Sequence, residues 1–93
     1  KFRLIEISGD SCAGCHALIP ALNAVAKEQD MEFLRIDLER DPQAAERYGI
    51  VKIPTVIIAD GDREIARCAG YQPPEILELW ISAKTEDYLR GKI

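Results

Sequence analysis

Two cysteines separated by two residues are the part of this sequence best suited to carry out chemistry. Cys12 and Cys15 flank Ala13 and Gly14, and two thiols at this spacing can close into a disulfide and open again. The pair follows a short apolar run, residues 2–7, and precedes a helical pattern. Cys12 is therefore predicted at a helix N-terminus, where unpaired N–H groups and the helix dipole favour a thiolate. We expect Cys12 to be the nucleophile and Cys15, less exposed, to attack second.

The same residues match a second kind of site. Cys12 to His16 reads Cys-Ala-Gly-Cys-His, which is the attachment motif of a c-type haem with His16 as the axial ligand. Cytochromes c are mainly helical, whereas this motif lies between a predicted strand and a predicted helix, so haem is the remote alternative. A zinc site needs further ligands, and only Cys68 is left over. We expect no metal and no cofactor, a surface position for His16, and a strand position for Cys68.

Apolar periodicity predicts the elements that must position the cysteines. In chain order they are strand 2–7, helix 12–29, strand 31–38, helix 42–48, strand 53–59, strand 63–69 and a helix from 73 to about 88. Pro20 is expected to kink the first helix, and Asp41 to cap the second. The last helix is expected to bury one stripe, made of Ile76, Leu77, Trp80 and Ile81. The order β-α-β-α-β-β-α predicts a three-layer α/β domain over residues 1–93, with a central four-stranded mixed sheet.

Composition excludes several classes of function. The chain has 93 residues and a net charge of −4 with its basic residues scattered, which makes nucleic acid an unexpected partner. Its longest apolar stretch is far shorter than the ~20 residues of a membrane-spanning helix. An odd number of cysteines, 3, suits one reactive pair plus a spare thiol better than a disulfide scaffold. We therefore expect a cytoplasmic monomer, with a periplasmic or exported location as the alternative.

Six features of the chain together resemble the thioredoxin-like superfamily. The order of elements is similar to a thioredoxin fold without its first strand and helix, and residues 12–15 look like its active-site motif. Pro20 resembles the family's helix-kinking proline. The segment 48–55, Tyr-Gly-Ile-Val-Lys-Ile-Pro-Thr, is similar to the one that ends in a cis-proline. Gly70 resembles the glycine that closes the substrate groove, and Glu6, six residues before Cys12, matches the buried acid.

The resemblance implies roles for these residues. The bond between Ile53 and Pro54 would be cis, leaving the Ile53 backbone free to pair with an extended substrate segment beside the sulfurs. Gly70 would close that groove. Glu6 alternates with Phe2 and Leu4, so its side chain is also expected to point into an apolar layer, where burial raises the pKa of a carboxyl group and suits it to proton transfer with Cys15.

Four positions depart from the family pattern. Thioredoxins have Trp before the first cysteine and Gly-Pro between the two, whereas this chain has Ser11 and then Ala13-Gly14. Phe33 is assigned to the position where thioredoxins keep a buried Lys paired with the acid. These differences leave the direction of electron flow open.

The leading hypothesis is a thiol-disulfide oxidoreductase of cell redox homeostasis and electron transport, in which Cys12 and Cys15 exchange with protein disulfides and with an upstream reductant or oxidant. The alternative is a thioredoxin-like redox-sensing or partner-binding module of a larger protein, which a chain that starts at Lys1 without an initiator Met allows.

Overall fold

The computed structural model describes residues 1–93 and has the predicted order of elements. Its elements are β1 (Phe2–Ser8), α1 (Ala13–Glu28), β2 (Glu32–Asp37), α2 (Ala44–Arg47), β3 (Thr55–Asp60), β4 (Arg63–Ala69) and α3 (Pro74–Leu89). The strands form one mixed sheet in the order β2-β1-β3-β4. β1 and β2 are parallel, and the other neighbouring pairs are antiparallel. The predicted βαβ unit, hairpin and mixed sheet are confirmed.

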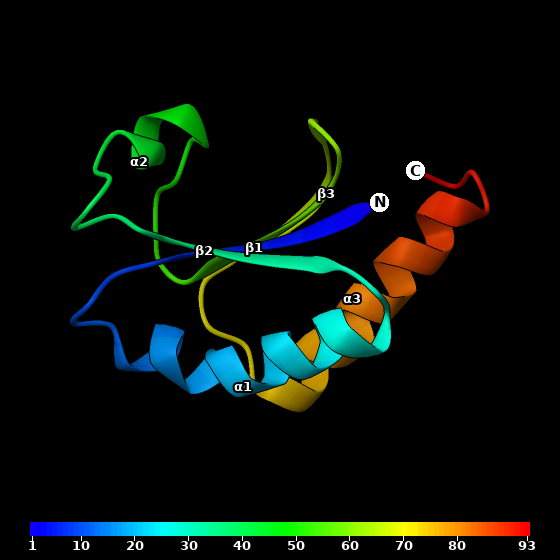
Figure 1. Cartoon of the computed structure of the whole chain (residues 1–93), viewed down its shortest axis with the longest axis horizontal. Helices are drawn as coiled ribbons and strands as arrows, with labels where there is room; N and C mark the ends of the chain where they lie inside the picture. The colour runs from blue at the N-terminus through cyan, green and yellow to red at the C-terminus, as the bar shows by residue number, and fades with distance from the viewer.

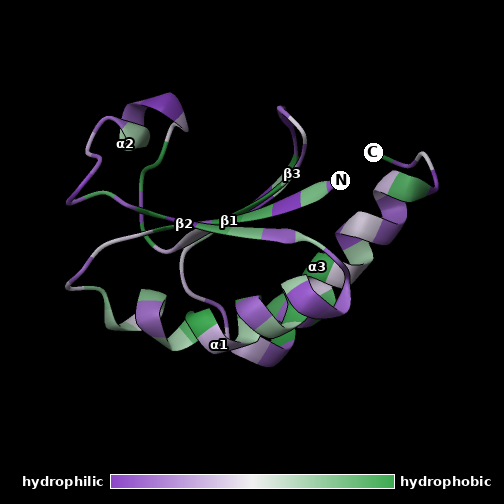
Figure 2. Ribbon diagram, viewed as in Figure 1, coloured by the Kyte–Doolittle hydropathy of each residue, from purple (hydrophilic) through white to green (hydrophobic).

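Three layers follow from the alternation of side chains along the strands. α1 and α3 cover one face of the sheet, and α2 lies over the other (Figure 1). On β1, Leu4 packs with the apolar side of α1 and α3, while Ile5 and Ile7 pack on the α2 side. Green apolar and purple polar segments alternate along α1 and α3 in Figure 2, as expected for helices with one buried face. No helix has the length and apolar content needed to cross a membrane.

Two local expectations were wrong. Asp41 does not cap α2, which begins at Ala44 with Gln43 as its N-cap. The Asp41 carboxylate instead accepts a hydrogen bond from Arg47 Nη2 at 2.8 Å, because an arginine on the short helix reaches back to it. Ile76 does not belong to the buried stripe of α3: it is 52% exposed, whereas Leu77 and Ile81 are buried. One step of about 100° along a helix carries a side chain off the buried face.

The strand register brings three loops to one end of the sheet. Ile7 lies opposite Thr55, and Thr55 lies opposite Ala69. The turn after β1, the segment before β3 and the segment after β4 therefore meet at the same edge. The first of these leads into Cys12 at the start of α1, so the sheet presents the other two segments to the cysteines.

Candidate functional site

Cys12 is the N-cap of α1, so its predicted position at the N-terminus of a helix is confirmed. Its Sγ accepts a hydrogen bond from the backbone N–H of Cys15 at 3.1 Å, and the two cysteines form a disulfide with Cα atoms 5.2 Å apart. Cys12 is partly exposed, and Cys15 is 0% exposed. After reduction, a sulfur that receives a helix N–H at the positive end of the dipole is stabilised as a thiolate.

The segment before β3 and the segment after β4 touch each other beside the cysteines. The peptide bond between Ile53 and Pro54 is cis, and the N–H of Gly70 donates to the Pro54 carbonyl at 2.7 Å. The Ile53 N–H and C=O make no backbone hydrogen bond within the chain. The structure thus brings together the three residues that the resemblance assigned to substrate binding, with unpaired backbone groups among them.

Glycines let these segments approach the cysteine turn closely. A Cβ on Gly9 would lie 3.1 Å from Ile53 Cδ1, and a Cβ on Gly14 would lie 3.1 Å from Tyr71 Cδ1. Tyr71 follows Gly70 and is 49% exposed. The sequence alone does not indicate this aromatic ring over the cysteine motif, because no short-range pattern connects residues 14 and 71.

Glu6 is buried below the cysteine end of the sheet. Its side chain carries an ionisable carboxyl group and yet is 0% exposed. Burial raises the pKa of Glu6 above its usual value, while a hydrogen bond and the positive charge of Arg35 partly oppose this rise. The buried, proton-retaining carboxyl group expected from the alternation of β1 is therefore present.

The cationic partner of Glu6 is Arg35, which corrects the assignment of Phe33 to that position. Arg35 Nε donates to Glu6 Oε1 at 3.1 Å, and the two residues are directly paired across β1 and β2. Phe33, two residues earlier on the same face, packs against the apolar core. Alternation on β2 could have indicated Arg35, since an arginine sharing the face of an inward phenylalanine must point inward too.

His16 is on the surface, as expected, and it fastens the loop that leads to Cys12. Its Nε2 lies 3.0 Å from the carbonyl oxygen of Asp10, and the N–H of Asp10 donates to Glu39 Oε2 at 2.7 Å. In this arrangement Nε2 is engaged with the backbone and Cys15 is buried. The geometry therefore gives the haem alternative no support.

Three carboxylates gather beside this loop. Oxygens of Asp10, Asp37 and Glu39 lie within 4.8 Å of one another. The contact with Asp37 raises the pKa of Asp10, and the same contact lowers the pKa of Asp37. Glu39 also accepts the Asp10 N–H at 2.7 Å, so the cluster is joined to the loop that leads to Cys12.

The third thiol is separate from the pair. Cys68 lies on β4 and is half-buried against the core of α1 and α3. Burial raises the pKa of its thiol, which disfavours the reactive thiolate. Trp80 also packs against this core, as expected.

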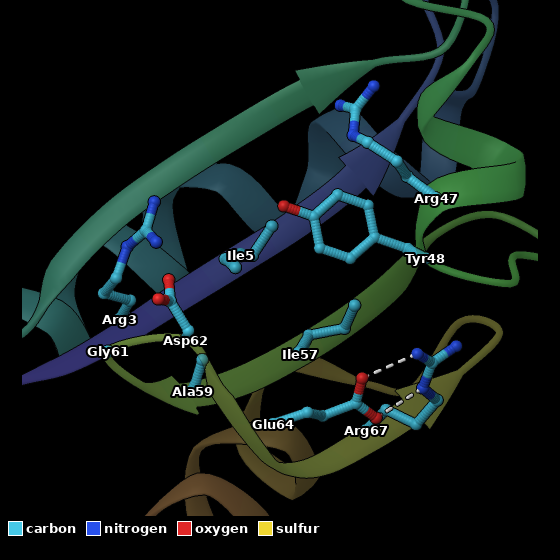
Figure 3. Close-up of a pocket in the computed structure, with 10 residues that line it drawn as sticks. All are labelled: Arg3, Ile5, Arg47, Tyr48, Ile57, Ala59, Gly61, Asp62, Glu64 and Arg67. Carbon is cyan, nitrogen blue, oxygen red and sulfur yellow. Dashed lines mark hydrogen bonds and ion pairs between the residues drawn. The ribbon is translucent and has the colours of Figure 1, made fainter.

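A cavity of about 280 Å³ lies on the α2 face of the sheet, away from the cysteines. Its floor consists of Ile5, Ile57 and Ala59, with the Tyr48 ring at its side (Figure 3). Figure 3 also shows Arg67 turned toward Glu64, to which it donates two hydrogen bonds of 2.7 Å. This cavity contains no thiol and is not part of the redox site.

Comparisons with known proteins agree with this geometry. The model of the thioredoxin family, described as "Thioredoxin", matches residues 1–83. A thioredoxin of Chlamydia trachomatis is 32% identical over 80 residues, covering 85% of this chain and 78% of that protein. A prophage-derived thioredoxin-like protein of Bacillus subtilis, YosR, is 30% identical over 78 residues, covering 83% and 92%. The structure of thioredoxin 1 from Thermosipho africanus superimposes with a TM-score of 0.79 at 27% identity, covering 95% of this chain and 94% of that one.

Proposed function

Because the chain belongs to the thioredoxin family of dithiol-disulfide oxidoreductases, we propose that Cys12 and Cys15 exchange their disulfide with disulfides of protein substrates. One observation carries the assignment of roles. The partly exposed Cys12 sulfur receives a helix N–H from Cys15, whereas the Cys15 side chain is fully buried. The first sulfur is accessible and stabilised as a thiolate, and the second reacts only within the protein.

The reductive half of the cycle follows from this asymmetry. The Cys12 thiolate attacks one sulfur of a substrate disulfide and expels the other as a thiolate, leaving a mixed disulfide. Cys15 then loses its proton and attacks the Cys12 sulfur. This second attack closes the Cys12–Cys15 disulfide and releases the remaining substrate thiolate. Two electrons pass from the cysteine pair to the substrate, and the oxidative direction is the exact reverse.

Glu6 is proposed to accept the proton of Cys15. Its raised pKa, caused mainly by burial, makes a carboxylate a better base than an exposed one would be. Arg35 holds the carboxylate by one oxygen, which leaves Oε2 for the proton.

The substrate is proposed to lie along Ile53, Pro54 and Gly70. The unpaired backbone groups of Ile53 support pairing with an extended segment of the substrate, as in the addition of a strand to a sheet. Such a segment would run beside the Cys12 sulfur, because the same end of the sheet holds both.

The oligomeric state, the compartment and the redox partners are also proposed. We expect residues 1–93 to act as one monomeric domain in the cytoplasm, serving an upstream reductant or oxidant together with its substrates. The free Cys68 thiol supports a reducing compartment.

Trapping experiments test the roles of the two sulfurs. Cys15→Ser should accumulate a mixed disulfide with insulin or another disulfide-containing protein, since Cys12 attacks the substrate disulfide and nothing resolves the product. Cys12→Ser should neither reduce insulin nor trap it. Cys68→Ser is the matched control and should keep full activity. Equal trapping by the Cys12 and Cys15 variants would contradict the assignment.

A further inference from the structure

Three buried polar atoms near Glu6 have no hydrogen-bond partner within the chain. They are Glu6 Oε2, Ser8 Oγ and Arg35 Nη2, and both Glu6 and Ser8 are 0% exposed. Buried polar groups are almost always hydrogen-bonded to protein or to an ordered water. Each of the three atoms therefore calls for a partner outside the protein chain.

The strand register places these atoms together. Glu6 pairs with Arg35 and Ser8 pairs with Asp37, on the parallel strands β1 and β2. Alternation puts all four side chains on the same face, with Cα atoms about 5 Å apart between the strands and about 7 Å apart along them. One water molecule joins polar atoms up to roughly 5.6 Å apart, so side chains that reach toward one another from these positions can share a bound water.

The group extends to the surface on one side. A groove of about 440 Å³ is lined by Arg35, Asp37 and the exposed Asp10. Arg35 thus contacts Glu6 at one end and borders the groove with the rest of its side chain, which is 29% exposed. On the cysteine side, Cys15 is fully buried, and a bound substrate would cover Cys12. A proton on Glu6 would therefore have no direct way to solvent past the two cysteines.

We propose that the proton accepted by Glu6 leaves through the edge of the sheet, over a water held by Glu6, Ser8 and Arg35, into the groove of Asp10 and Asp37. This inference rests on the proposed function, in which Glu6 deprotonates Cys15. No electrons move in this step: the Glu6 carboxyl gives its proton to solvent and returns to a carboxylate, and the substrate thiolates take protons from solvent.

The charged surroundings suit such a path. Arg35 on β2 donates to Glu6 Oε1, His16 lies nearby on α1, and the β3 neighbour of Glu6, Val56, is apolar. At the outer end, oxygens of Asp10, Asp37 and Glu39 lie within 4.8 Å of one another, and the contact with Asp37 raises the pKa of Asp10. A carboxyl group with a raised pKa takes up a proton more readily than an isolated aspartate does.

Stopped-flow kinetics in a Cys68→Ser background can separate the two chemical steps. Reduced protein mixed with a chromogenic aryl disulfide should release one aryl thiolate in a concentration-dependent phase, the attack of Cys12. A second thiolate should follow in a concentration-independent phase, the attack of Cys15. The variants are Ser8→Ala at the buried end and Asp37→Asn at the groove, with Asp62→Asn on the exposed hairpin turn as the charge-matched control.

Ser8→Ala should slow the second phase by about tenfold, the rate equivalent of one lost hydrogen bond, and increase its solvent isotope effect in D₂O. Asp37→Asn should change the pH profile of that phase. The first phase and the Asp62→Asn control should stay unchanged. A high-resolution crystal structure should show a water bonded to Glu6 Oε2 and Ser8 Oγ.

The result that overturns this path is a second phase within about twofold of the parent for both Ser8→Ala and Asp37→Asn from about pH 6 to about pH 9. Glu6→Gln distinguishes this failure from failure of the proposed function. If Glu6→Gln slows the second phase and the other two variants do not, Glu6 is the base but uses another path. If Glu6→Gln also leaves it unchanged, the role of Glu6 itself is wrong.

Discussion

The ring of Tyr71 lies against Gly14, in the middle of the cysteine motif. A Cβ at position 14 would stand 3.1 Å from Tyr71 Cδ1, which is tighter than an ordinary van der Waals contact. Gly14 therefore allows an aromatic side chain from the segment after β4 to cover the turn between the two cysteines. Since Tyr71 directly follows Gly70, the same segment borders both the motif and the proposed substrate groove.

This contact predicts energetic coupling between the two residues. Alanine at position 14 favours the helix over glycine by up to about 1 kcal/mol, but it must displace the ring. We expect Gly14→Ala to change the free energy of unfolding little in the parent chain and to stabilise the Tyr71→Ala variant. A double-mutant cycle by urea unfolding should give a coupling of about 0.5 to 1 kcal/mol. Strict additivity would show that the ring does not rest on Gly14 in solution.

Cys68 should react more slowly than Cys12 in the reduced protein. Its pKa is raised by burial, so less thiolate is present at neutral pH, and the half-buried position limits access. Cys12, at a helix N-terminus, has the opposite environment. Alkylation of reduced protein with iodoacetamide, followed by peptide mass spectrometry, should label Cys12 at least roughly tenfold faster than Cys68. Faster labelling of Cys68 would contradict its buried environment.

The sequence pattern predicted the helices and strands because each of them depends mainly on residues that are neighbours in the sequence. The alternation of Phe2, Leu4 and Glu6 correctly buried Glu6, since the side-chain period of a strand is a local property. The partner of Glu6 is not local. Phe33 and Arg35 share a face, and only the register of β1 against β2 shows which of them lies opposite Glu6.

The same distinction explains the other differences. Asp41 has the residue type of a helix cap, but an arginine on the following helix competes for its carboxylate. The contact between the Tyr71 ring and Gly14 joins segments that are far apart in the sequence. They meet only because the end of β1, the start of β3 and the end of β4 lie at the same edge of the sheet. Contacts of this kind require the assembled sheet.

Gly70 should tolerate substitution less well than Gly49. Both have positive φ, 93° and 63°, where an L side chain is strained by about 1 to 2 kcal/mol. A Cβ at Gly49 meets open space, whereas one at Gly70 would lie 3.1 Å from Lys52 Cδ, and φ of 93° exceeds the usual left-handed region. Gly70→Ala should therefore lower the free energy of unfolding by more than Gly49→Ala, the matched control, as measured by urea unfolding. Equal losses would contradict a special requirement at position 70.

Glu6 should make the stability of the protein fall as the pH rises. Its pKa is raised in the folded state, above all by burial and despite Arg35. A raised pKa means that the folded state holds the proton more tightly than the unfolded state does. The resulting stabilisation is complete below the unfolded pKa, near 4.5, and is lost as the pH rises through the folded pKa.

Glu6→Gln removes this titration and tests its sign. Relative to the parent, the variant should become more stable between about pH 4 and about pH 8, by roughly 1 kcal/mol or more, the scale on which a buried charge affects stability. Arg35→Met should steepen the pH dependence of the parent chain, because the buried carboxylate then loses its partner. Glu28→Gln, at an exposed position on α1 that forms no ion pair, is the control. Glu28→Gln should not gain stability relative to the parent as the pH rises. If Glu6→Gln instead became less stable relative to the parent as the pH rises, the Arg35 interaction would outweigh burial and the pKa of Glu6 would be lowered.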